Sequence, residues 1–422
     1  MGTVAEPQTY EVLVLGGGIA GITAALELAR LGREVALVEK TPFFGGQAAL
    51  LTCKATDVCQ KCGACLVEER LRSLFQEPGI ALFLQTRLTA SAKRDKGFRL
   101  LLAQQPLVIS PERCVDCGLC YDECPAVSQG AIVTTSVTQN HPRLAVNPEA
   151  CLYFRDGSCR VCEKICPPTA KAIDLDRPPQ TFELDVKAIL LTTGYRPADP
   201  SCRPHYGYGR YPQILSGLDL EKALRQGRGL PQLQGEGPRK VAFIQCVGSR
   251  DLAHSYCSQV CCAYSLRLAH LLKHRQPEVA ITMFYMDWQN VGREGDRFLR
   301  EVRREVRVVR ALPGDLRPGR NGTLDLRYLD EDTGRAVTEA FHLVVLAVGI
   351  NPGADNPELA ALLQLDLNPE GFIHTENESR AYQTRQPGVF VAGTAAGPAD
   401  IASCLVQAAG VARRINQYLK SP

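Results

Sequence analysis

The spacing of the cysteines constrains this chain more than any other feature of its sequence. Eighteen of the 422 residues are cysteine, and all but Cys202 and Cys404 fall into groups of four. The first group is Cys53, Cys59, Cys62 and Cys65, the second is Cys114, Cys117, Cys120 and Cys124, the third is Cys151, Cys159, Cys162 and Cys166, and the fourth is Cys246, Cys257, Cys261 and Cys262. Four thiolates are what a tetrahedral zinc ion or a cubane iron–sulfur cluster requires. The pattern therefore predicts a chain built around several metal centres.

The overall composition excludes several classes of protein. The chain is 45% hydrophobic and carries 48 basic and 45 acidic residues, so neither a small disulfide scaffold nor a disordered chain is expected. The length predicts two or three domains, and no basic block indicates a nucleic-acid partner. The first residues show no signal peptide, and glycines interrupt the apolar stretch 12–29, so we expect no membrane span. We expect a cytoplasmic protein whose thiols stay reduced and available to metals.

A glycine-rich turn near the N-terminus predicts a dinucleotide site. Residues 10–15 are a predicted buried strand, residues 22–31 a helix, and residues 34–38 a second strand that leads into Glu39. The turn between the first strand and the helix contains three glycines, Gly16, Gly18 and Gly21. Such a turn permits close approach to a pyrophosphate, and Glu39 stands where it would accept hydrogen bonds from a ribose. The alternative is a glycine-rich turn with a structural role alone.

Three further segments resemble the FAD-binding motifs of glutathione-reductase-like flavoproteins. Residues 45–46 are a glycine pair, residues 186–197 include a predicted strand that ends in Thr-Gly, and residues 388–399 resemble the second FAD motif. That motif usually has an acid after its glycine, where this chain has Thr394. A helix predicted over residues 401–418 would point its N-terminus at the flavin ring. The resemblance implies FAD contacts at Gly16, Gly18, Ile19, Ala20, Gly21, Glu39, Lys40, Gly45, Gly46, Gln47, Thr193, Gly194, Gly393, Thr394 and Ala395.

The second and third cysteine groups have the spacing of bacterial ferredoxins. The second is C-x2-C-x2-C-x3-C followed by proline, and the third is the same run with a longer first gap. In two-cluster ferredoxins the fourth cysteine of each run ligates the other cluster. We therefore predict one [4Fe–4S] cluster on Cys114, Cys117, Cys120 and Cys166, and another on Cys151, Cys159, Cys162 and Cys124.

The first cysteine group has the less regular spacing C-x5-C-x2-C-x2-C, and Gly63 permits a sharp turn between its ligands. We predict a [4Fe–4S] cluster on this group and keep a structural zinc ion as the alternative. Cys53 is the least constrained of the four ligands. Cys202 and Cys404 are expected to be a loop thiol and a helix-packing thiol, and each is a candidate to replace Cys53.

The fourth cysteine group stands where flavoprotein reductases have the turn of their nicotinamide-binding domain. A strand predicted over residues 239–245, a helix over 263–273 and a strand over 279–285 form a second βαβ unit. Its first turn contains a single glycine together with the four cysteines. We predict that Cys257 and Cys261 share one helix face, and that a [4Fe–4S] cluster replaces the dinucleotide. The alternative is a set of buried structural cysteines.

The remaining sequence contains no constellation of catalytic acid, base and nucleophile, which fits an electron relay. His270 and His274 are four residues apart on a basic helix and are predicted to lie at the surface. The arginine-rich stretch 293–310 is predicted to be a solvated amphipathic helix. A docking face for an acidic carrier such as ferredoxin is the alternative for this stretch.

The order of these motifs resembles the heterodisulfide reductase family, and within it the A subunit. The most specific part of the resemblance is QCVGSR followed by YCSQVCC, and the matching segments are residues 16–39, 151–195, 206–212, 243–250, 256–262 and 389–394. The family binds FAD, has a [4Fe–4S] cluster at the YCSQVCC cysteines and works inside multi-subunit complexes, and some members bifurcate electrons at the flavin. The resemblance implies an α/β, glutathione-reductase-like flavoprotein with two dinucleotide-binding-type domains and an inserted two-cluster ferredoxin domain.

These observations predict a chain divided into five segments. They are the first part of the FAD domain (1–105), the ferredoxin insertion (106–180), the second part of the FAD domain (181–235), a cluster-bearing unit like a nicotinamide domain (236–350) and the C-terminal part of the FAD domain (351–422). The expected partners are subunits like heterodisulfide reductase B and C, a carrier such as ferredoxin, and a second copy of the chain. The alternatives are an NAD(P)H-dependent iron–sulfur flavoprotein reductase and a non-enzymatic iron–sulfur carrier or scaffold.

Overall fold

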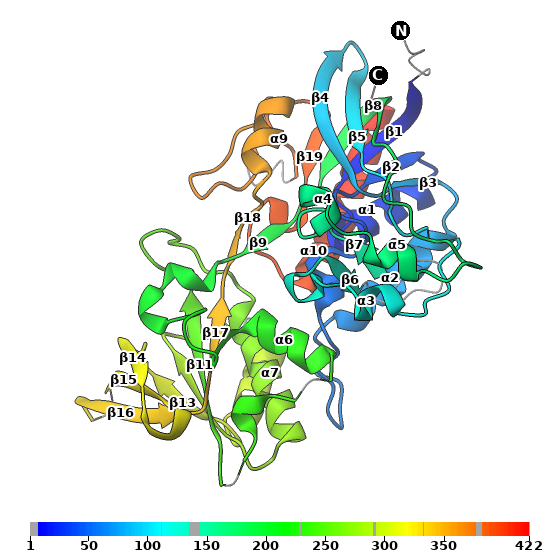
Figure 1. Ribbon diagram of the computed structural model, residues 1–422. Helices are drawn as coiled ribbons and strands as arrows, with labels where there is room; N and C mark the ends of the chain where they lie inside the picture. Colours follow the sequence, from blue (N-terminus) through cyan, green and yellow to red (C-terminus); the bar gives the residue numbers. More distant parts are fainter. Residues whose placement is uncertain are drawn as a thin grey trace.

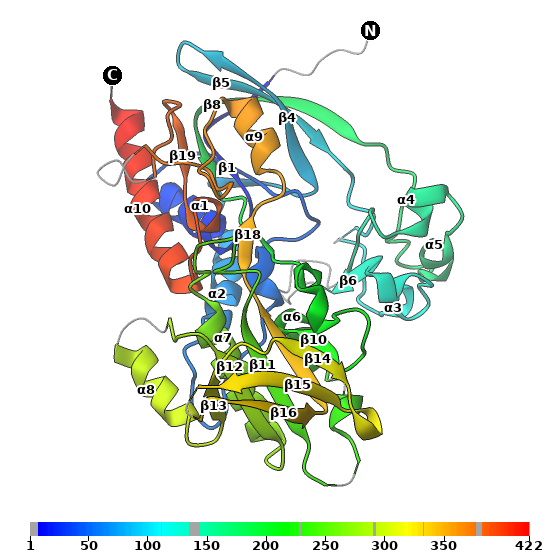
Figure 2. The same ribbon diagram turned by 90° about the vertical axis from the view of Figure 1, so that its left-hand side faces the viewer.

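The fold contains two large sheets joined by a pair of crossing strands, with a small cysteine-rich unit at one side (Figures 1 and 2). The computed structural model describes residues 7–110, 112–134, 144–227, 229–235, 237–289, 293–331, 333–376 and 382–421. The predicted domain segment 106–180 therefore contains residues 111 and 135–143, which lie outside the described part of the chain.

The first sheet is assembled from distant parts of the sequence. Within the described residues it has seven strands, β1 (Gln8–Leu15), β2 (Val35–Val38), β3 (Ile80–Phe83), β4 (Thr86–Arg94), β5 (Gly97–Gln104), β8 (Gln180–Leu191) and β19 (Val389–Val391). The order is β3-β2-β1-β8-β5-β4, and β19 pairs with the C-terminal part of β8. The pairs among β1, β2, β3, β8 and β19 are parallel, whereas β4 and β5 form an antiparallel hairpin on β8.

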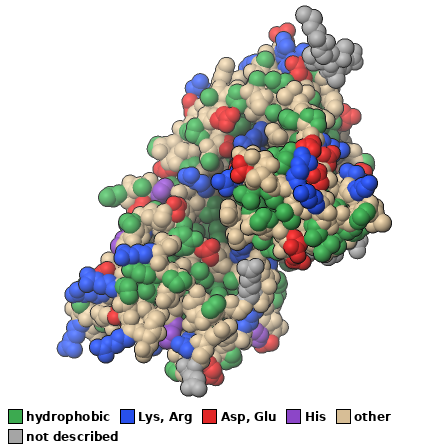
Figure 3. Space-filling model, viewed as in Figure 1, with side chains coloured by type: hydrophobic (Ala, Val, Ile, Leu, Met, Phe, Trp, Pro, Cys, Tyr) green, Lys and Arg blue, Asp and Glu red, His purple; other side chains and the backbone are tan. Residues whose placement is uncertain are grey.

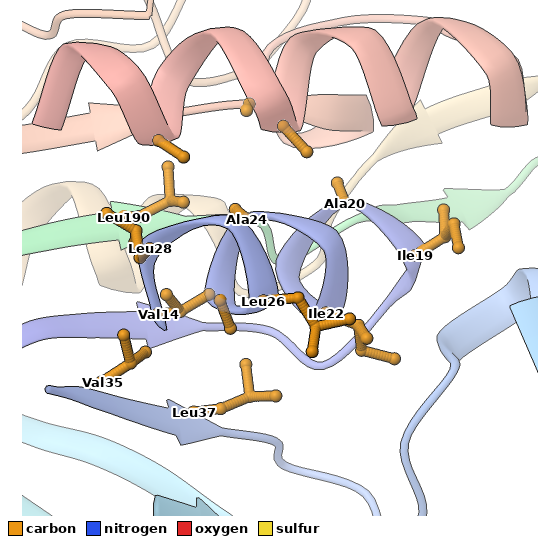
Figure 4. Close-up of a cluster of buried hydrophobic side chains, with 14 of the residues drawn as sticks. Val14, Ile19, Ala20, Ile22, Ala24, Leu26, Leu28, Val35, Leu37 and Leu190 are labelled. Atoms are coloured by element: carbon orange, nitrogen blue, oxygen red, sulfur yellow. The ribbon is translucent and has the colours of Figure 1, made fainter. Parts of the chain in front are cut away.

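Helices cover both faces of this sheet. They are α1 (Ile19–Arg30), α2 (Ala64–Gln76), α9 (Asn356–Leu363) and α10 (Ile401–Lys420). Helix α1 lies between the sheet and α10, with Ala20 and Ala24 towards α10 and with Ile22 and Leu26 towards β1 and β2 (Figure 4). Small side chains on the α10 side allow the two helices to approach closely, which keeps the N-termini of both near the ends of β1 and β19.

The second sheet is parallel throughout. Its order is β10-β17-β11-β12-β13, formed by β10 (Ile214–Ser216), β17 (Leu343–Val348), β11 (Lys240–Val247), β12 (Ala280–Tyr285) and β13 (Arg307–Arg310). Its helices are α6 (Gly217–Arg225), α7 (Cys261–Arg275) and α8 (Arg293–Val302). A three-stranded antiparallel sheet packs beside it, made of β14 (Asp315–Pro318), β15 (Leu324–Asp330) and β16 (Arg335–Phe341). A parallel sheet with helical crossovers is the arrangement that brings strand C-termini together at one edge.

Two short strands connect the sheets. Strand β9 (Tyr195–Pro197) leaves the first sheet and β18 (Ile350–Pro352) returns to it, and the two pair in antiparallel fashion. The cysteine-rich unit leaves the first sheet between β5 and β8 and contains α3 (Leu119–Asp122), α4 (Leu152–Asp156), α5 (Val161–Ile165), β6 (Ile132–Thr134) and β7 (Leu144–Val146). The 3-10 helices are η1 (Gly46–Leu50), η2 (Val127–Gln129), η3 (Pro200–Cys202), η4 (Pro204–Tyr206), η5 (Pro231–Leu233), η6 (Arg320–Gly322) and η8 (Gly393–Ala395).

The structure corrects two predictions about local conformation. The stretch 293–310 is not one helix, because α8 ends at Val302 and β13 follows as an edge strand next to β12. Cys257 does not share a helix face with Cys261, because it lies in the loop before α7, which begins at Cys261. No helix in the described ranges is long and apolar enough to cross a membrane.

Candidate flavin and iron–sulfur sites

Packing requires two of the three glycines of the predicted dinucleotide turn. Gly16 has φ +110°, and a Cβ atom there would lie 2.4 Å from the carbonyl oxygen of Thr192. A Cβ atom at Gly21 would lie 1.9 Å from the carbonyl oxygen of Gly16. At Gly18, by contrast, a Cβ atom would meet nothing within 4 Å. The turn therefore packs tightly against β8 and α1 and leaves open space at its middle glycine, as a phosphate-binding turn requires.

The second glycine pair joins this turn, as the flavoprotein motifs imply. The amide of Gly45 donates to the carbonyl oxygen of Gly17 at 2.7 Å, and Gly45 forms a bridge with Gly18. The FAD motifs at residues 186–197 and 388–399 also meet, because a Cβ atom at Gly194 would lie 4.0 Å from the Thr394 hydroxyl oxygen. The structure thus brings together residues that are up to 378 positions apart along the chain, from Gly16 to Thr394.

Glu39 is held in place by backbone amides. Its carboxylate accepts hydrogen bonds from the amides of Gly17 (2.7 Å) and Thr41 (2.8 Å), and the residue is buried. Burial raises the pKa of this carboxyl, and the two amides oppose that rise. The side chain therefore stands at the C-terminal end of β2, oriented at the edge where a ribose would lie.

A pocket beside Glu39 suits a polar ligand such as FAD. It is lined by Leu15, Gly16, Val38, Glu39, Lys40, Thr86, Arg87, Leu88, Thr193, Asp355, Glu358 and Leu359. The hydroxyl of Thr193 is buried and has no hydrogen-bond partner among the described residues. Lys40 forms an ion pair with Asp355 across the pocket. An unpaired buried hydroxyl in the lining of this pocket fits the polar groups of a bound dinucleotide.

Two of the amides that were expected to face the flavin bond within the protein. The amide of Gly393 donates to Gln407 Oε1 at 2.9 Å, and the amide of Thr394 donates to the Cys404 thiol. Cys404 is buried on α10, and burial raises its pKa to about 11. It is thus a helix-packing thiol, as the sequence suggested.

In the cysteine-rich unit, cysteines of the second group lie beside cysteines of the third group. Cys124 lines one cavity with Cys151, Cys159 and Cys162. The charges that affect the pKa of Cys114 include those of Cys117 and Cys166. Burial raises the pKa of Cys120 to about 11 and that of Cys162 to about 12. A cysteine that ligates a metal must be a thiolate, and burial disfavours that charged form. Bound cluster iron would therefore have to offset the cost of burying the thiolate charges.

The first cysteine group repeats the backbone of the second. In both loops the residue before the central cysteine and the glycine after it have positive φ, +49° and +79° for Lys61 and Gly63, and +60° and +80° for Asp116 and Gly118. Each glycine then begins a helix, α2 or α3. In both loops the backbone amide two residues after the first cysteine donates to the sulfur of that cysteine. The Lys61 amide donates to Cys59 at 3.4 Å, and the Asp116 amide donates to Cys114. The two loops are therefore the same local structure.

The fourth group converges at the C-terminal end of β11. Cys246 has φ +60° and follows a register shift between β11 and β17, so a bulge directs its side chain out of the sheet. The pKa of Cys246 rises to about 11, first through burial and then through Cys262. The amide of Gln259 donates to the Cys257 sulfur at 3.3 Å. Amide-to-sulfur hydrogen bonds of this kind also stabilise cluster thiolates.

A salt bridge flanks the fourth group. Arg250 binds Asp287 through two hydrogen bonds, and its charge acts on Cys246 and Cys257. Sequence reasoning had not singled out either residue, nor Tyr195, whose pKa burial raises to about 12 and whose neighbours include Cys261 and Cys404. Arg250 lies within the QCVGSR sequence, but no sequence signal links it to Asp287, which is 37 positions away along the chain.

In the described ranges, no group of three or more His, Cys, Asp or Glu side chains lies close enough together to hold one metal ion. His274 is exposed, as predicted, whereas His270 is partly buried and its Nδ1 lies 3.2 Å from Glu305 Oε2. Cys202 is an exposed thiol, 3.3 Å from the Cβ position of Gly248.

The arginine-rich region is partly neutralised by acidic partners. Basic side chains gather over β13 to β16 on the face shown in Figure 3. Arg307 pairs with Glu339 at 2.8 Å, and Arg310 and Arg317 also have carboxylate partners. These ion pairs reduce the net positive charge of the region. They therefore weigh against the alternative that the region is a docking face for an acidic carrier.

Comparison with solved structures confirms the predicted fold class. The chain is similar to thioredoxin reductase from T. acidophilum (TM-score 0.53, 14% identity, 98% of this chain and 100% of that one). It is equally similar to thioredoxin reductase from Lactococcus lactis (TM-score 0.53, 14% identity, 97% of this chain and 99% of that one). At this identity the likeness concerns the fold, which is that of a two-dinucleotide-binding flavoprotein.

Fold and sites together define a flavin-dependent oxidoreductase that carries iron–sulfur clusters. Residues 11–77 match the family model described as FAD dependent oxidoreductase, and residues 103–170 match the model described as 4Fe-4S dicluster domain. These matches support FAD and [4Fe–4S] clusters as the cofactors.

Two curated relatives are similar to this chain along nearly its whole length. The chain is 30% identical over 424 residues to the A subunit of H(2):CoB-CoM heterodisulfide,ferredoxin reductase from Methanothermobacter marburgensis, and the match covers 96% of this chain and 63% of that protein. It is 31% identical over 425 residues to the iron-sulfur A subunit of CoB--CoM heterodisulfide reductase from Methanocaldococcus jannaschii, again over 96% of this chain and 63% of that protein. The chain is thus a homologue of the heterodisulfide reductase A subunits along nearly its whole length, which confirms the resemblance, and it spans less than two thirds of these relatives.

Proposed function

We propose that the chain is the FAD- and [4Fe–4S]-containing electron-transfer subunit of a heterodisulfide-reductase-like complex. The single observation that carries this proposal is the fourth cysteine group at the end of β11. Four cysteines converge there, at the strand edge where a two-dinucleotide flavoprotein has its second nucleotide site. A cluster at this edge takes the place of a diffusible nicotinamide cofactor. The chain would therefore exchange electrons with centres held by partner subunits.

When bound, FAD takes up electrons in pairs and releases them singly, whereas each cubane carries one electron. The chain contributes binding, orientation and exclusion of water. The turn at Gly16 to Gly21 and the Thr193 hydroxyl would hold the dinucleotide, with Glu39 at the ribose. The amides around the cysteine groups would donate to sulfur, as those of Lys61 and Gln259 already do. The hydrogen bonds and the burial of these thiols are the means by which the protein sets potentials.

We further propose four clusters rather than three. The first cysteine group has the loop conformation of the second group, whose ferredoxin spacing is typical of cubane ligation. This identity of backbone supports a cluster over zinc on Cys59, Cys62 and Cys65. Cys53 is the proposed fourth ligand, because its sulfur accepts a 3.5 Å hydrogen bond from the amide of Ala55, two residues on, as in the other groups.

The proposed division of the chain follows the predicted segments 1–105, 106–180, 181–235, 236–350 and 351–422 with one change. Strands β5 and β8 flank the cysteine-rich unit, and the pair β9–β18 flanks the second sheet. Because β10 and α6 belong to the second sheet and its helices, the proposed cluster-bearing unit begins after β9 rather than at residue 236. The proposed partners are the subunits like heterodisulfide reductase B and C, with a second copy of this chain. Ferredoxin is the proposed carrier, because the names of the relatives from Methanothermobacter and from Methanosarcina mazei include ferredoxin. Co-purification of the tagged chain from its source cells would identify the subunits.

Cofactor content gives the first test. Anaerobically purified protein is expected to contain one FAD and about sixteen iron atoms, four for each of four cubanes. Metal analysis and flavin absorbance measure these quantities. About twelve iron atoms together with one zinc ion would show that the first group is a zinc site, and about eight would contradict the cluster on the fourth group as well. Rapid bleaching of the flavin by NADPH in the isolated chain would contradict the relay and favour a nicotinamide-dependent reductase.

A further inference from the structure

The segment that carries the first cysteine group packs against the helices of the other sheet. Between η1 and α2 the chain runs down beside α6 and α7, which belong to the second sheet (Figures 1 and 2). Its other neighbour is α10, because a Cβ atom at Gly63 would lie 3.1 Å from the Ile401 side chain. The first cysteine group is therefore held between the N-terminus of α10 and the helices of the unit that carries the fourth group.

A buried ion pair fixes the start of this segment. Lys54 Nζ lies 2.7 Å from Glu221 Oε1, and the two side chains are only 2% and 3% exposed. Glu221 also accepts hydrogen bonds from the Thr52 amide and from the Tyr264 hydroxyl at 3.0 Å. Lys54 Nζ donates to the Thr52 carbonyl at 2.8 Å and lies 5.4 Å from the centre of the Tyr264 ring. Both charges are thus paired and hydrogen-bonded, which is the condition under which a buried pair is tolerated.

One face of α7 holds the rest of the segment. Tyr264, Arg267 and His270 are three residues apart and so lie along one side of the helix. Arg267 donates to the carbonyl oxygens of Gln60 at 2.9 Å and Lys61 at 3.3 Å. His270 Nε2 lies 3.5 Å from the Thr56 hydroxyl. These contacts reach the backbone just after Cys59 and a side chain three residues before it.

The same helix begins with two ligands of the fourth group. Cys261 and Cys262 form the first turn of α7, and Arg267 lies six residues after Cys261, which is about 9 Å along the helix axis. A single rigid element therefore contacts both cysteine groups. Because the Tyr264 hydroxyl also joins α7 to the buried Lys54–Glu221 pair, whose glutamate lies on α6, the distance between the groups does not depend on the two crossing strands alone.

We propose that α7, locked by the Lys54–Glu221–Tyr264 network, is a rigid bridge that sets the distance between the first and fourth cysteine groups. The bridge makes the two groups direct neighbours in electron exchange. In that step an electron lost by one cluster is gained by the other, and no bond is formed or broken. The electron exchange rests on the proposed function, whereas the mechanical lock does not. Lys54, Glu221 and Tyr264 are positioning residues, since they act through the backbone of the cysteine segment.

Hydrogen exchange of the full chain tests the lock without reference to cofactors. Lys54→Met leaves the Glu221 carboxylate buried without its cation, and amide exchange in peptides covering residues 52–65 is expected to rise by roughly a hundredfold, the factor that corresponds to breaking a buried pair. Peptides covering residues 114–124, in the matched loop of the second group, are expected to stay unchanged. Lys222→Met removes an exposed lysine next to Glu221 and is the matched control.

Two further variants keep the test decisive if Lys54→Met folds poorly. Arg267→Gln removes the carbonyl contacts without leaving a buried charge, and it should raise exchange in residues 52–65 alone. The double variant Lys54→Met, Glu221→Gln leaves no buried charge, and its exchange should be slower than that of Lys54→Met. Unchanged exchange in residues 52–65, an equal rise in residues 114–124, or additive effects in the double variant would each overturn the lock.

Electron paramagnetic resonance of the reduced holoprotein tests the bridge itself. A magnetic interaction between the clusters of the first and fourth groups is expected, and Arg267→Gln should weaken it while the iron content stays constant. An interaction that Arg267→Gln leaves intact would overturn the bridge. If the parent protein lacks iron on the first group, the four-cluster proposal fails, and the exchange experiment still decides whether the segment is locked.

Discussion

Replacing Cys124 with serine is expected to remove the cluster of the third group, although Cys124 belongs to the second group in sequence. The structure places Cys124 in one cavity with Cys151, Cys159 and Cys162, and the pKa of its thiol, raised mainly by burial, is raised further by Cys151 and Cys159. A cubane that loses one of four thiolates loses its anchoring. We expect about four of sixteen iron atoms to be lost, measured by metal analysis.

Spectra of matched variants identify which cluster is lost. The reduced-state spectrum of Cys124→Ser should match that of Cys159→Ser and differ from that of Cys117→Ser. Cys202→Ser, at an exposed thiol outside the four groups, should retain all of the iron. A Cys124→Ser spectrum that matches Cys117→Ser would show that each run ligates its own cluster.

The second large effect concerns the flavin. In Gly21→Ala the new Cβ atom would lie 1.9 Å from the Gly16 carbonyl oxygen and 2.6 Å from the Thr192 hydroxyl oxygen. Helix α1 must then move away from the turn, at a cost of about 1–3 kcal/mol for overpacking, and the dinucleotide turn loses its shape. Flavin absorbance is expected to fall almost to zero, while the iron of the cysteine-rich unit remains and reports that the chain is folded.

Gly32→Ala is the control for Gly21→Ala, because it lies just past the other end of the same helix. A Cβ atom there meets nothing within 4 Å, although φ +75° makes alanine unfavourable by about 1–2 kcal/mol. This variant should unfold at a lower temperature and still bind FAD. Equal flavin content in Gly21→Ala and the parent protein would contradict the placement of the nucleotide at this turn.

Much of the fold was predictable because the sequence patterns are local. The first strand, the glycine turn and the second strand were placed to within a few residues, since a buried strand, a tight turn and an amphipathic helix each have a short-range pattern. Helix α1 begins at Ile19 rather than at residue 22, because the helix starts within the glycine turn itself. The crossed cysteine sets stay a prediction from ferredoxin spacing, with which the position of Cys124 beside Cys151, Cys159 and Cys162 agrees.

The errors and omissions have physical reasons. The strand β13 was missed because its short Arg-Val-Val-Arg sequence was absorbed into a longer arginine-rich pattern. Cys257 was placed on a helix because four-residue spacing suggests one, yet Gln259 between the two cysteines has φ +61° and cannot be helical. Lys54 would be expected at the surface from sequence, and only its partner Glu221, 167 positions away, makes its burial possible.

The hairpin-like relation of β5 and β8 has a consequence for how such a chain is assembled. These strands are antiparallel neighbours, and Gln104 at the end of β5 lies opposite Gln180 at the start of β8. The ferredoxin-like unit therefore leaves and re-enters the first sheet at adjacent points, and the sheet's pairing is complete without it. Such a unit is an inserted domain that can be gained, lost or exchanged as a whole. The flavin-binding scaffold is then able to acquire a different electron-transfer route to its partners while the pairing of its own sheet stays unchanged.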